Sequence, residues 1–199
     1  MTATLEEIRG YLDGLGYRYS FDEEEGFFSL LFNTETYRDE EGEATVRLVI
    51  YVADKGNTFG CLATGLYVVR NEPHEAAILR SLMYANALRK FVRFEMDHSG
   101  GEVLASIVIP VADSRLTEEQ FRVTVEFLLT AVEETYPMIM HARETGKVSA
   151  IRPAEYERQK LVERVGRLSD ESRAKVLKAL DEALEKAGPL GGDEELDRL

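Results

Sequence analysis

Residues 91–111 decide the fold, and they read FVRFEMD-HSGG-EVLASIVIPV. Apolar residues recur at every second position in the runs before and after the polar turn His98–Gly101. A period of two is that of a β-strand with one buried face. A glycine-rich turn between two such runs is typical of a hairpin. The stretch therefore predicts two adjacent antiparallel strands.

Three more strands are predicted before this hairpin, because the same alternation occurs in Phe27–Asn33, Ala44–Ala53 and Thr58–Val69. Asp54–Asn57 has the composition of a tight turn between the second and third of them. The third run contains two internal glycines, at positions 60 and 65. Glycine inside a strand predicts a bulge, a strong bend or the close approach of another group.

Helices are predicted on either side of the strands. Leu5–Leu15 has apolar residues at helical spacing after a capping residue, Thr4. A second helix is expected to open at Asn71 and Pro73. Its predicted buried side comprises Ala77, Ile78, Leu82, Met83, Ala85 and Leu88. A third helix follows the capping box Thr117–Gln120, and Pro137 is expected to kink or interrupt it near Tyr136.

The composition changes after Gly146, where a linker, two further helices and a loose acidic tail are predicted. One of these helices would span Pro153–Gly166, and Ser169 would cap the other. We therefore expect an α+β domain over residues 1–146 and a helical C-terminal extension over residues 147–199. The α-βββ-α-ββ-α order predicts a five-stranded antiparallel sheet with helices packed on one face.

The net charge of −13 argues against nucleic acid and anionic membranes as partners, since both are bound by basic residues. The one cysteine, Cys61, lies in a strand-like run and is expected to be a buried, inert thiol. The sequence shows neither a secretion signal nor a long apolar run, so we expect a cytoplasmic protein without a membrane span.

The second face of the predicted sheet is also partly apolar. Its candidate interaction residues are Leu31, Val49, Tyr51, Leu104 and Val108. A solvated sheet face is normally polar, and a large apolar patch usually marks a contact. A homodimer partner, the C-terminal helices or a client protein could cover the patch. Alternatively, these residues are scattered singly and merely exposed.

No stretch carries a signature of catalysis or of a bound cofactor. His74, His98 and His141 lack the spacing of zinc ligands, and Gly60–Gly65 lacks the residues of a phosphate-binding loop. We therefore expect no catalytic residue, no cofactor, no metal site and no enzymatic activity. A small-ligand sensor is the alternative, with Phe94, Met96 and Leu128 as candidate pocket walls, although core packing accounts for them as well.

The chain resembles the YbjN family, whose fold is that of type III secretion chaperones. The resemblance spans about residues 5–144. It is carried by the element order, by Asn86 in Tyr-Ala-Asn-Ala-Leu, by the 91–111 hairpin, by Leu116-Thr-Glu-Glu-Gln-Phe and by Tyr136-Pro137. It implies a regulatory or chaperone-like module that binds itself, as a homodimer, and an unidentified protein partner.

Overall fold

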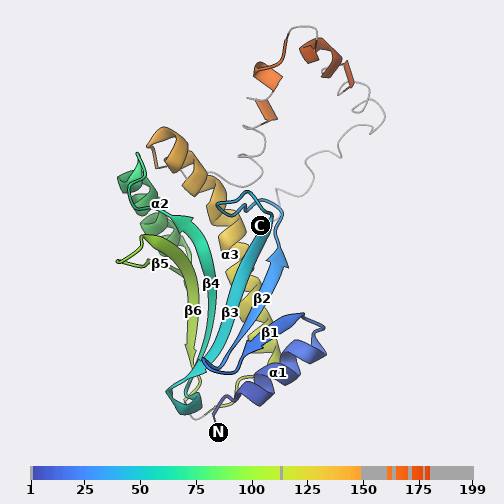
Figure 1. The fold of residues 1–199 in the computed structure, drawn as a ribbon, viewed down its shortest axis with the longest axis vertical. Coiled ribbons are helices and arrows are strands. Elements are labelled where there is room, and N and C mark those ends of the chain that lie inside the picture. Colours follow the sequence, from blue (N-terminus) through green and yellow to red (C-terminus); the bar gives the residue numbers. More distant parts are fainter. Residues whose placement is uncertain are drawn as a thin grey trace, which may run out of the picture. The chain divides into compact units, whose positions relative to one another are not determined.

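The computed structural model describes residues 2–112, 114–148, 161–162, 165–169, 172–176 and 178–179. The chain falls into two compact units, Met1–Pro153 and Ala154–Leu199. The described residues of the first unit form three α-helices and six strands (Figure 1). The helices are α1 (Leu5–Gly14), α2 (Glu75–Leu88) and α3 (Glu118–Thr145), and a 3-10 turn, η1, spans Asp54–Gly56. The strands are β1 (Tyr19–Asp22), β2 (Phe27–Asn33), β3 (Thr45–Ala53), β4 (Thr58–Val68), β5 (Arg93–Met96) and β6 (Glu102–Pro110).

All six strands form one antiparallel sheet in the order β1-β2-β3-β4-β6-β5. The predicted α+β class and the predicted hairpin are confirmed, with Phe94 opposite Ala105. The predicted number of five strands is wrong, because Tyr19–Asp22 pairs with β2 as a sixth strand. β1 has only four residues, which are too few for an alternation to stand out from its surroundings.

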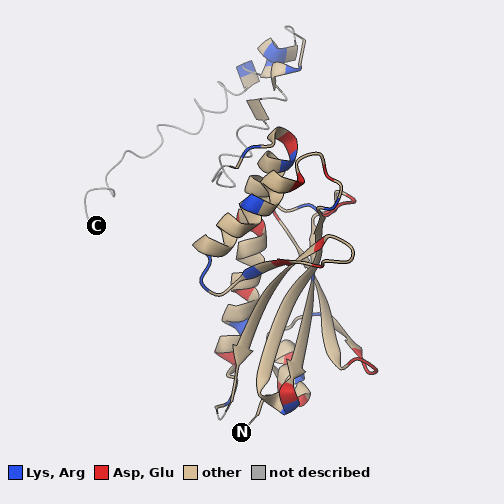
Figure 2. Ribbon diagram, turned by 90° about the vertical axis from the view of Figure 1, so that its left-hand side faces the viewer, with Lys and Arg blue, Asp and Glu red and all other residues tan. Residues whose placement is uncertain are grey.

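One face of the sheet carries the core. Phe28, Leu48 and Ile50 are fully buried there, and Phe121 and Leu128 of α3 are equally buried. The helix α3 contacts β4 and β6, whereas α2 contacts α3 and β5. Figure 2 shows α2 and α3 on one side of the sheet. Burial of apolar side chains between this face and the helices is the main force that holds the unit together.

The helix starts follow the capping chemistry where a capping box is present. Thr4 caps α1, and Thr117 and Gln120 cap α3, as predicted. Glu7 completes a capping box with Thr4, which was not predicted. The predicted start of α2 is wrong: Asn71 lies in a left-handed turn with φ of 67°, and the helix begins at Glu75. Four of the predicted buried residues of α2 are buried, namely Ala77, Ile78, Leu82 and Ala85. Met83 and Leu88 are exposed, so these two assignments are wrong.

The helix α3 runs without interruption through Pro137. Of the two predicted outcomes, the interruption is therefore wrong, and the kink stays a prediction. Pro137, Met138 and Ile139 are all buried. Their packing in the core stabilises the helical course on both sides of the proline.

The two strand glycines of β4 have the roles that the sequence suggested. A Cβ atom on Gly60 would lie 2.1 Å from Cζ of Tyr51, so the tyrosine ring covers the glycine. Gly65 has φ of +68°, and the register of β4 and β6 shifts between Ala63 and Tyr67. A left-handed residue at a register shift is a β-bulge, a conformation that glycine adopts at little cost.

Only part of the predicted C-terminal helices lies within the described residues, so only part of that prediction can be compared with the structure. Ser169 Oγ accepts a hydrogen bond from the N–H of Ser172 at 3.4 Å, as expected of a helix cap. Most of the predicted helix 153–166 and all of the tail 191–199 lie outside the described residues. The proposed domain limits, 1–146 and 147–199, stay predictions.

Candidate functional site

The candidate interaction residues lie on the sheet face opposite the core. The pairing register places Tyr51, Gly60 and Val108 side by side on β3, β4 and β6. In the next row, Val49 lies opposite Leu62, which lies opposite Ser106. Strand residues two apart share a face. All five candidates, Leu31, Val49, Tyr51, Leu104 and Val108, are therefore on the same face, which we call the open face.

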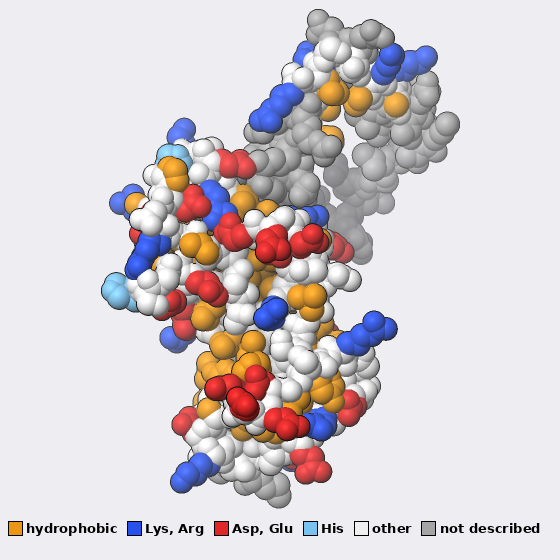
Figure 3. All heavy atoms as spheres, viewed as in Figure 1, with side chains coloured by type: hydrophobic (Ala, Val, Ile, Leu, Met, Phe, Trp, Pro, Cys, Tyr) orange, Lys and Arg blue, Asp and Glu red, His pale blue; other side chains and the backbone are white. Residues whose placement is uncertain are grey.

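The open face is apolar in its middle and polar at its margins. Val108 is 52% exposed and Leu31 is 65% exposed, whereas Val49, Tyr51 and Leu104 are half-buried. Figure 3 shows hydrophobic side chains gathered over the strands on this side. The structure brings Tyr51 close to Val108 across Gly60, whose missing side chain makes room for the ring.

Two of the five candidates stand apart from this centre. Leu31 lies opposite Arg47, and Leu104 lies opposite Glu95. Two further apolar residues of the face, Phe27 and Leu62, were missed by the sequence prediction. Phe27 lies opposite Tyr51, a pairing that is known only from the register of β2 and β3. The sequence signal was available for Phe27, which shares the parity of Leu31 on the same strand. No residue of β4 was predicted for this face, so the face of Leu62 follows from the pairing with β3.

A polar hollow of about 490 Å³ adjoins Leu31 at one margin of the open face. Its charged lining consists of Asp39, Glu41, Glu43, Arg47 and Glu102. Of these, Asp39 accepts hydrogen bonds from the backbone of its own loop, and Glu102 accepts one from the Gly65 N–H. These carboxylates therefore stabilise the loop and the bulge that bound the hollow.

The loop of residues 34–44, which connects β2 to β3, is held against α3 at two points. The Glu133 carboxylate accepts hydrogen bonds from the N–H groups of Glu35, Thr36 and Tyr37, at 2.5, 2.8 and 2.8 Å. Because these three donors converge on one side chain, a single carboxylate orders the first turn of the loop.

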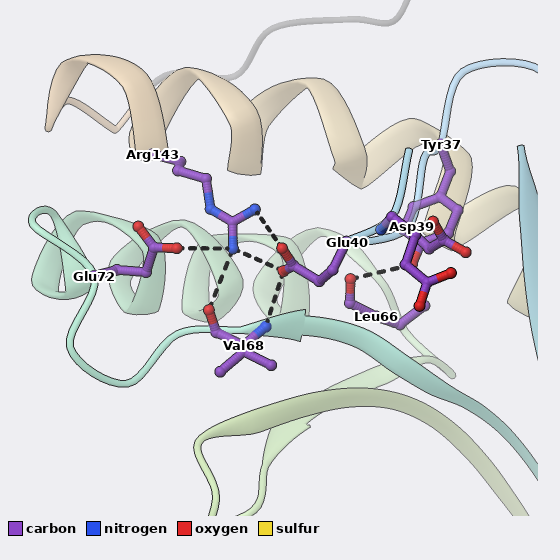
Figure 4. Close-up of polar contacts among 8 residues, drawn as sticks. Tyr37, Asp39, Glu40, Leu66, Val68, Glu72 and Arg143 are labelled. Carbon is purple, nitrogen blue, oxygen red and sulfur yellow. Dashed lines mark hydrogen bonds and ion pairs between the residues drawn. The ribbon is translucent and has the colours of Figure 1, made fainter. Parts of the chain in front are cut away.

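Arg143 makes the second attachment (Figure 4). Its guanidinium pairs with Glu40 at 2.8 Å and with Glu72 at 3.1 Å, and it donates to the Val68 carbonyl at 3.2 Å. Between the two attachments, the buried Tyr37 hydroxyl donates to the Leu66 carbonyl at 3.1 Å. The cluster joins the 34–44 loop, β4, the turn before α2 and the end of α3.

The buried ionisable groups have the properties of structural residues. Burial raises the pKa of the Cys61 thiol to about 12, so the thiol is protonated at neutral pH, as predicted. Burial also raises the pKa of Tyr37 and of Tyr67, which keeps both hydroxyls neutral. A neutral, enclosed thiol or phenol is a poor nucleophile or base.

Two of the three predicted pocket walls are core residues. Phe94 and Leu128 are buried in the hydrophobic core, and Met96 lies near the surface. Among the described residues, no group of three or more His, Cys, Asp or Glu is placed to hold a metal ion. None of the helices in that part of the chain is long and apolar enough to cross a membrane.

The first unit is thus an antiparallel sheet with helices on one face and a partly apolar second face. A family model described as "YbjN: Putative bacterial sensory transduction regulator" matches residues 4–140. The chain therefore belongs to the YbjN family, which confirms the resemblance noted from the sequence.

A solved structure shows the same fold. "Crystal structure of YbjN, a putative transcription regulator from E. coli" matches at 17% identity with a TM-score of 0.50, over 71% of this chain and 92% of that one. "Crystal Structure of the ExsC-ExsE Complex" matches at 24% identity with a TM-score of 0.46, over 66% of this chain and 92% of that one. The search of curated proteins gave no match.

Proposed function

We propose that this protein is a non-catalytic, cytoplasmic protein-binding module, regulatory or chaperone-like, that acts as a homodimer through the open face of its sheet. The observation that carries the proposal is the partly apolar face on which Val49, Tyr51 and Val108 gather. Apolar surface of this kind is stabilised when a partner removes it from water. The description of the family as a regulator supports the same function.

The negative charge of the chain favours some classes of binding partner over others. A net charge of −13 repels phosphate backbones and anionic lipid surfaces, and it favours neutral or basic protein surfaces. We therefore propose a second copy of the chain and an additional protein as partners, and neither nucleic acid nor a membrane.

The test is a charge variant of the open face, Leu31→Glu with Val49→Glu. We expect it to shift the protein from dimer to monomer in size-exclusion chromatography with light scattering, because carboxylates in a desolvated interface are costly. Met83→Glu is the matched control, since Met83 is an exposed apolar residue of α2. The proposal would be refuted if the Leu31→Glu, Val49→Glu variant self-associates as the unchanged protein does and also binds the same partner proteins.

The alternative is a domain that senses a small ligand. The burial of Phe94 and Leu128 in the core weakens this proposal, because both residues are already packed against neighbours. Its test is a thermal-shift screen of metabolites, in which a specific ligand would raise the unfolding temperature in proportion to its concentration.

A further inference from the structure

The outer edge of β6 is left uncovered over its last residues. β5 pairs with β6 only from Arg93 opposite Ser106 to Met96 opposite Val103. β6 continues to Pro110, with β4 as its neighbour on the inner side. Figure 1 shows the second half of β6 as the outermost strand at this side of the sheet.

The backbone groups that point outward can be assigned from the pairing. In an antiparallel sheet, successive residues direct their N–H and C=O groups to opposite sides. The Glu102 carbonyl accepts a hydrogen bond from Asp97 N–H on the β5 side, so the residues two, four and six positions later face that side too. Leu104 and Ser106 meet β5, whereas the N–H and C=O of Val108 extend beyond its end.

By contrast, the edge of β5 itself is closed by a side chain. Asn86 of α2 donates from Nδ2 to the Phe94 carbonyl at 3.0 Å and accepts the Phe94 N–H on Oδ1 at 2.7 Å. The amide group thus makes the two hydrogen bonds that another strand would make. An exposed strand edge is a template for pairing, and natural proteins often block it. At Val108 no such block is present among the described residues.

Two hollows flank this edge, one on each side of the sheet. The hollow toward α3 has a volume of about 330 Å³, and its walls are mainly apolar: Phe91, Ile107, Ile109, Val123 and Phe127. The rings of Phe91 and Phe127 are parallel, with centroids 6.2 Å apart, and both are largely exposed.

The hollow on the open side, of about 320 Å³, is polar and contains Lys90, Arg93, Glu95 and Ser106. Glu95 already accepts a hydrogen bond from Ser106 Oγ at 3.0 Å. Lys90 and Arg93 make no ion pair with any described residue, which leaves two cations at this site of an otherwise acidic chain.

We infer that the Val108 edge binds an extended segment of a partner protein, which adds to β6 as a short strand with alternating apolar and acidic residues. The partner residue opposite Val108 exchanges both backbone hydrogen bonds with it. Its side chain lies on the open side, where a carboxylate meets Lys90 and Arg93. The residues before and after it direct apolar side chains toward Phe91 and Phe127.

This inference rests on the premise of the proposed function that the protein binds proteins. The two contacts adjoin at Val108, whose side chain belongs to the open face and whose backbone forms the edge. The probe is a phage library of random peptides of about twelve residues, selected on the full chain. Selection against the variant Phe91→Asp with Phe127→Asp removes peptides that bind elsewhere. We expect enriched peptides with an acidic residue between two apolar ones.

A synthetic peptide from this selection then reports on each part of the site. The Phe91→Asp, Phe127→Asp variant should bind it at least about tenfold more weakly. Lys90→Glu with Arg93→Glu should weaken binding similarly and favour a peptide in which lysine replaces the acidic residue. Bound peptide should also slow amide exchange at Val108. Met83→Asp, on exposed α2 surface, is the control and should leave the affinity unchanged.

Three results would overturn the inference. They are a selection without enrichment, equal peptide binding by the Phe91→Asp, Phe127→Asp variant with a native circular dichroism spectrum, or dissociation of a dimer by that variant. The last result would make a second copy the occupant. If the Leu31→Glu, Val49→Glu variant loses partner binding and the Phe91→Asp, Phe127→Asp variant does not, the proposed function is supported and the edge site is refuted. If only the Phe91→Asp, Phe127→Asp variant loses partner binding, the edge site is supported and the open face is refuted as the contact.

Discussion

At the scale of single residues, Gly101 is a position where the structure leaves no room for a side chain. It has φ of +77°, and an added Cβ would lie 2.4 Å from the Arg70 Cβ and 3.0 Å from the Arg70 backbone nitrogen. We predict that Gly101→Ala lowers the free energy of unfolding by at least about 2 kcal/mol, because strain and overlap with backbone add together. Urea denaturation measures the change.

The control for this prediction is Gly10→Ala in α1. Gly10 is exposed, and its Cβ position has no neighbour within 4 Å. The substitution should stabilise the protein by about 0.5–1 kcal/mol, since alanine restricts the unfolded chain and favours the helix. A loss of stability at Gly101 no larger than the effect at Gly10 would contradict the assigned crowding.

A second residue-scale prediction concerns the pH dependence of the β5–β6 turn. Asp97 accepts hydrogen bonds from the Ser99 hydroxyl at 2.6 Å and from the N–H groups of Gly100 and Ser99, at 2.8 and 3.1 Å. The Ser99 hydroxyl is the main cause that lowers the pKa of Asp97 to about 2, followed by these backbone donors.

Because the folded state lowers this pKa, the turn gains stability from Asp97 above the ordinary aspartate value and loses it as the pH falls toward 2. Ser99→Ala should raise the pKa of Asp97 toward its ordinary value. A carboxyl-carbon NMR titration measures this, with Ser114→Ala as the control. The assignment is wrong if Asp97 titrates identically in both variants.

At the scale of elements, the attachment of the 34–44 loop to α3 depends on Glu133. Removal of its carboxylate leaves three backbone donors without their partner. We predict that Glu133→Ala destabilises the protein by about 1–3 kcal/mol and accelerates hydrogen exchange at residues 35–37.

The adjacent Glu134 provides the control for this prediction. Glu134 pairs with Arg89 on the surface, and such pairs contribute about 0–1 kcal/mol. Glu134→Ala should therefore leave exchange at residues 35–37 unchanged. Equal exchange rates in the two variants would show that Glu133 does not order the loop.

Local chemistry could be predicted from the sequence at this scale, and contacts between distant residues could not. The two capping boxes and the hairpin depend on residues a few positions apart, so their signals are visible in the chain itself. Glu133 and Asn86 act through hydrogen bonds to the backbone of other elements, which leave no periodic pattern. β1 was missed because it is too short, and the start of α2 because Asn71 favours a left-handed turn as readily as a cap.

The candidate face was partly predictable for the same reason. Parity along each strand identified Val49, Tyr51 and Val108 as members of one face. The sequence did not contain the register between strands, so it could not show that Tyr51 and Val108 meet over Gly60. Nor could it show that β5 ends before β6 does, which requires the paired structure.

At the scale of the whole molecule, we predict that a chain ending at Gly146 folds on its own. The family match ends at residue 140, and the core residues that the structure describes in the first unit precede Gly146. The shortened protein should keep its cooperative thermal unfolding in circular dichroism, whereas its self-association should change. A chain that is unfolded when residues 147–199 are removed would show that these residues belong to the core.

The attachment of the 34–44 loop also has a consequence for how the protein is made. The loop leaves the ribosome early, whereas Glu133 and Arg143 are 96 to 103 residues further along the chain. While the nascent chain grows, its first three strands are therefore synthesised before the helix that fastens them exists. Folding during translation must wait for α3, and until then the emerging strands depend on other means to avoid aggregation.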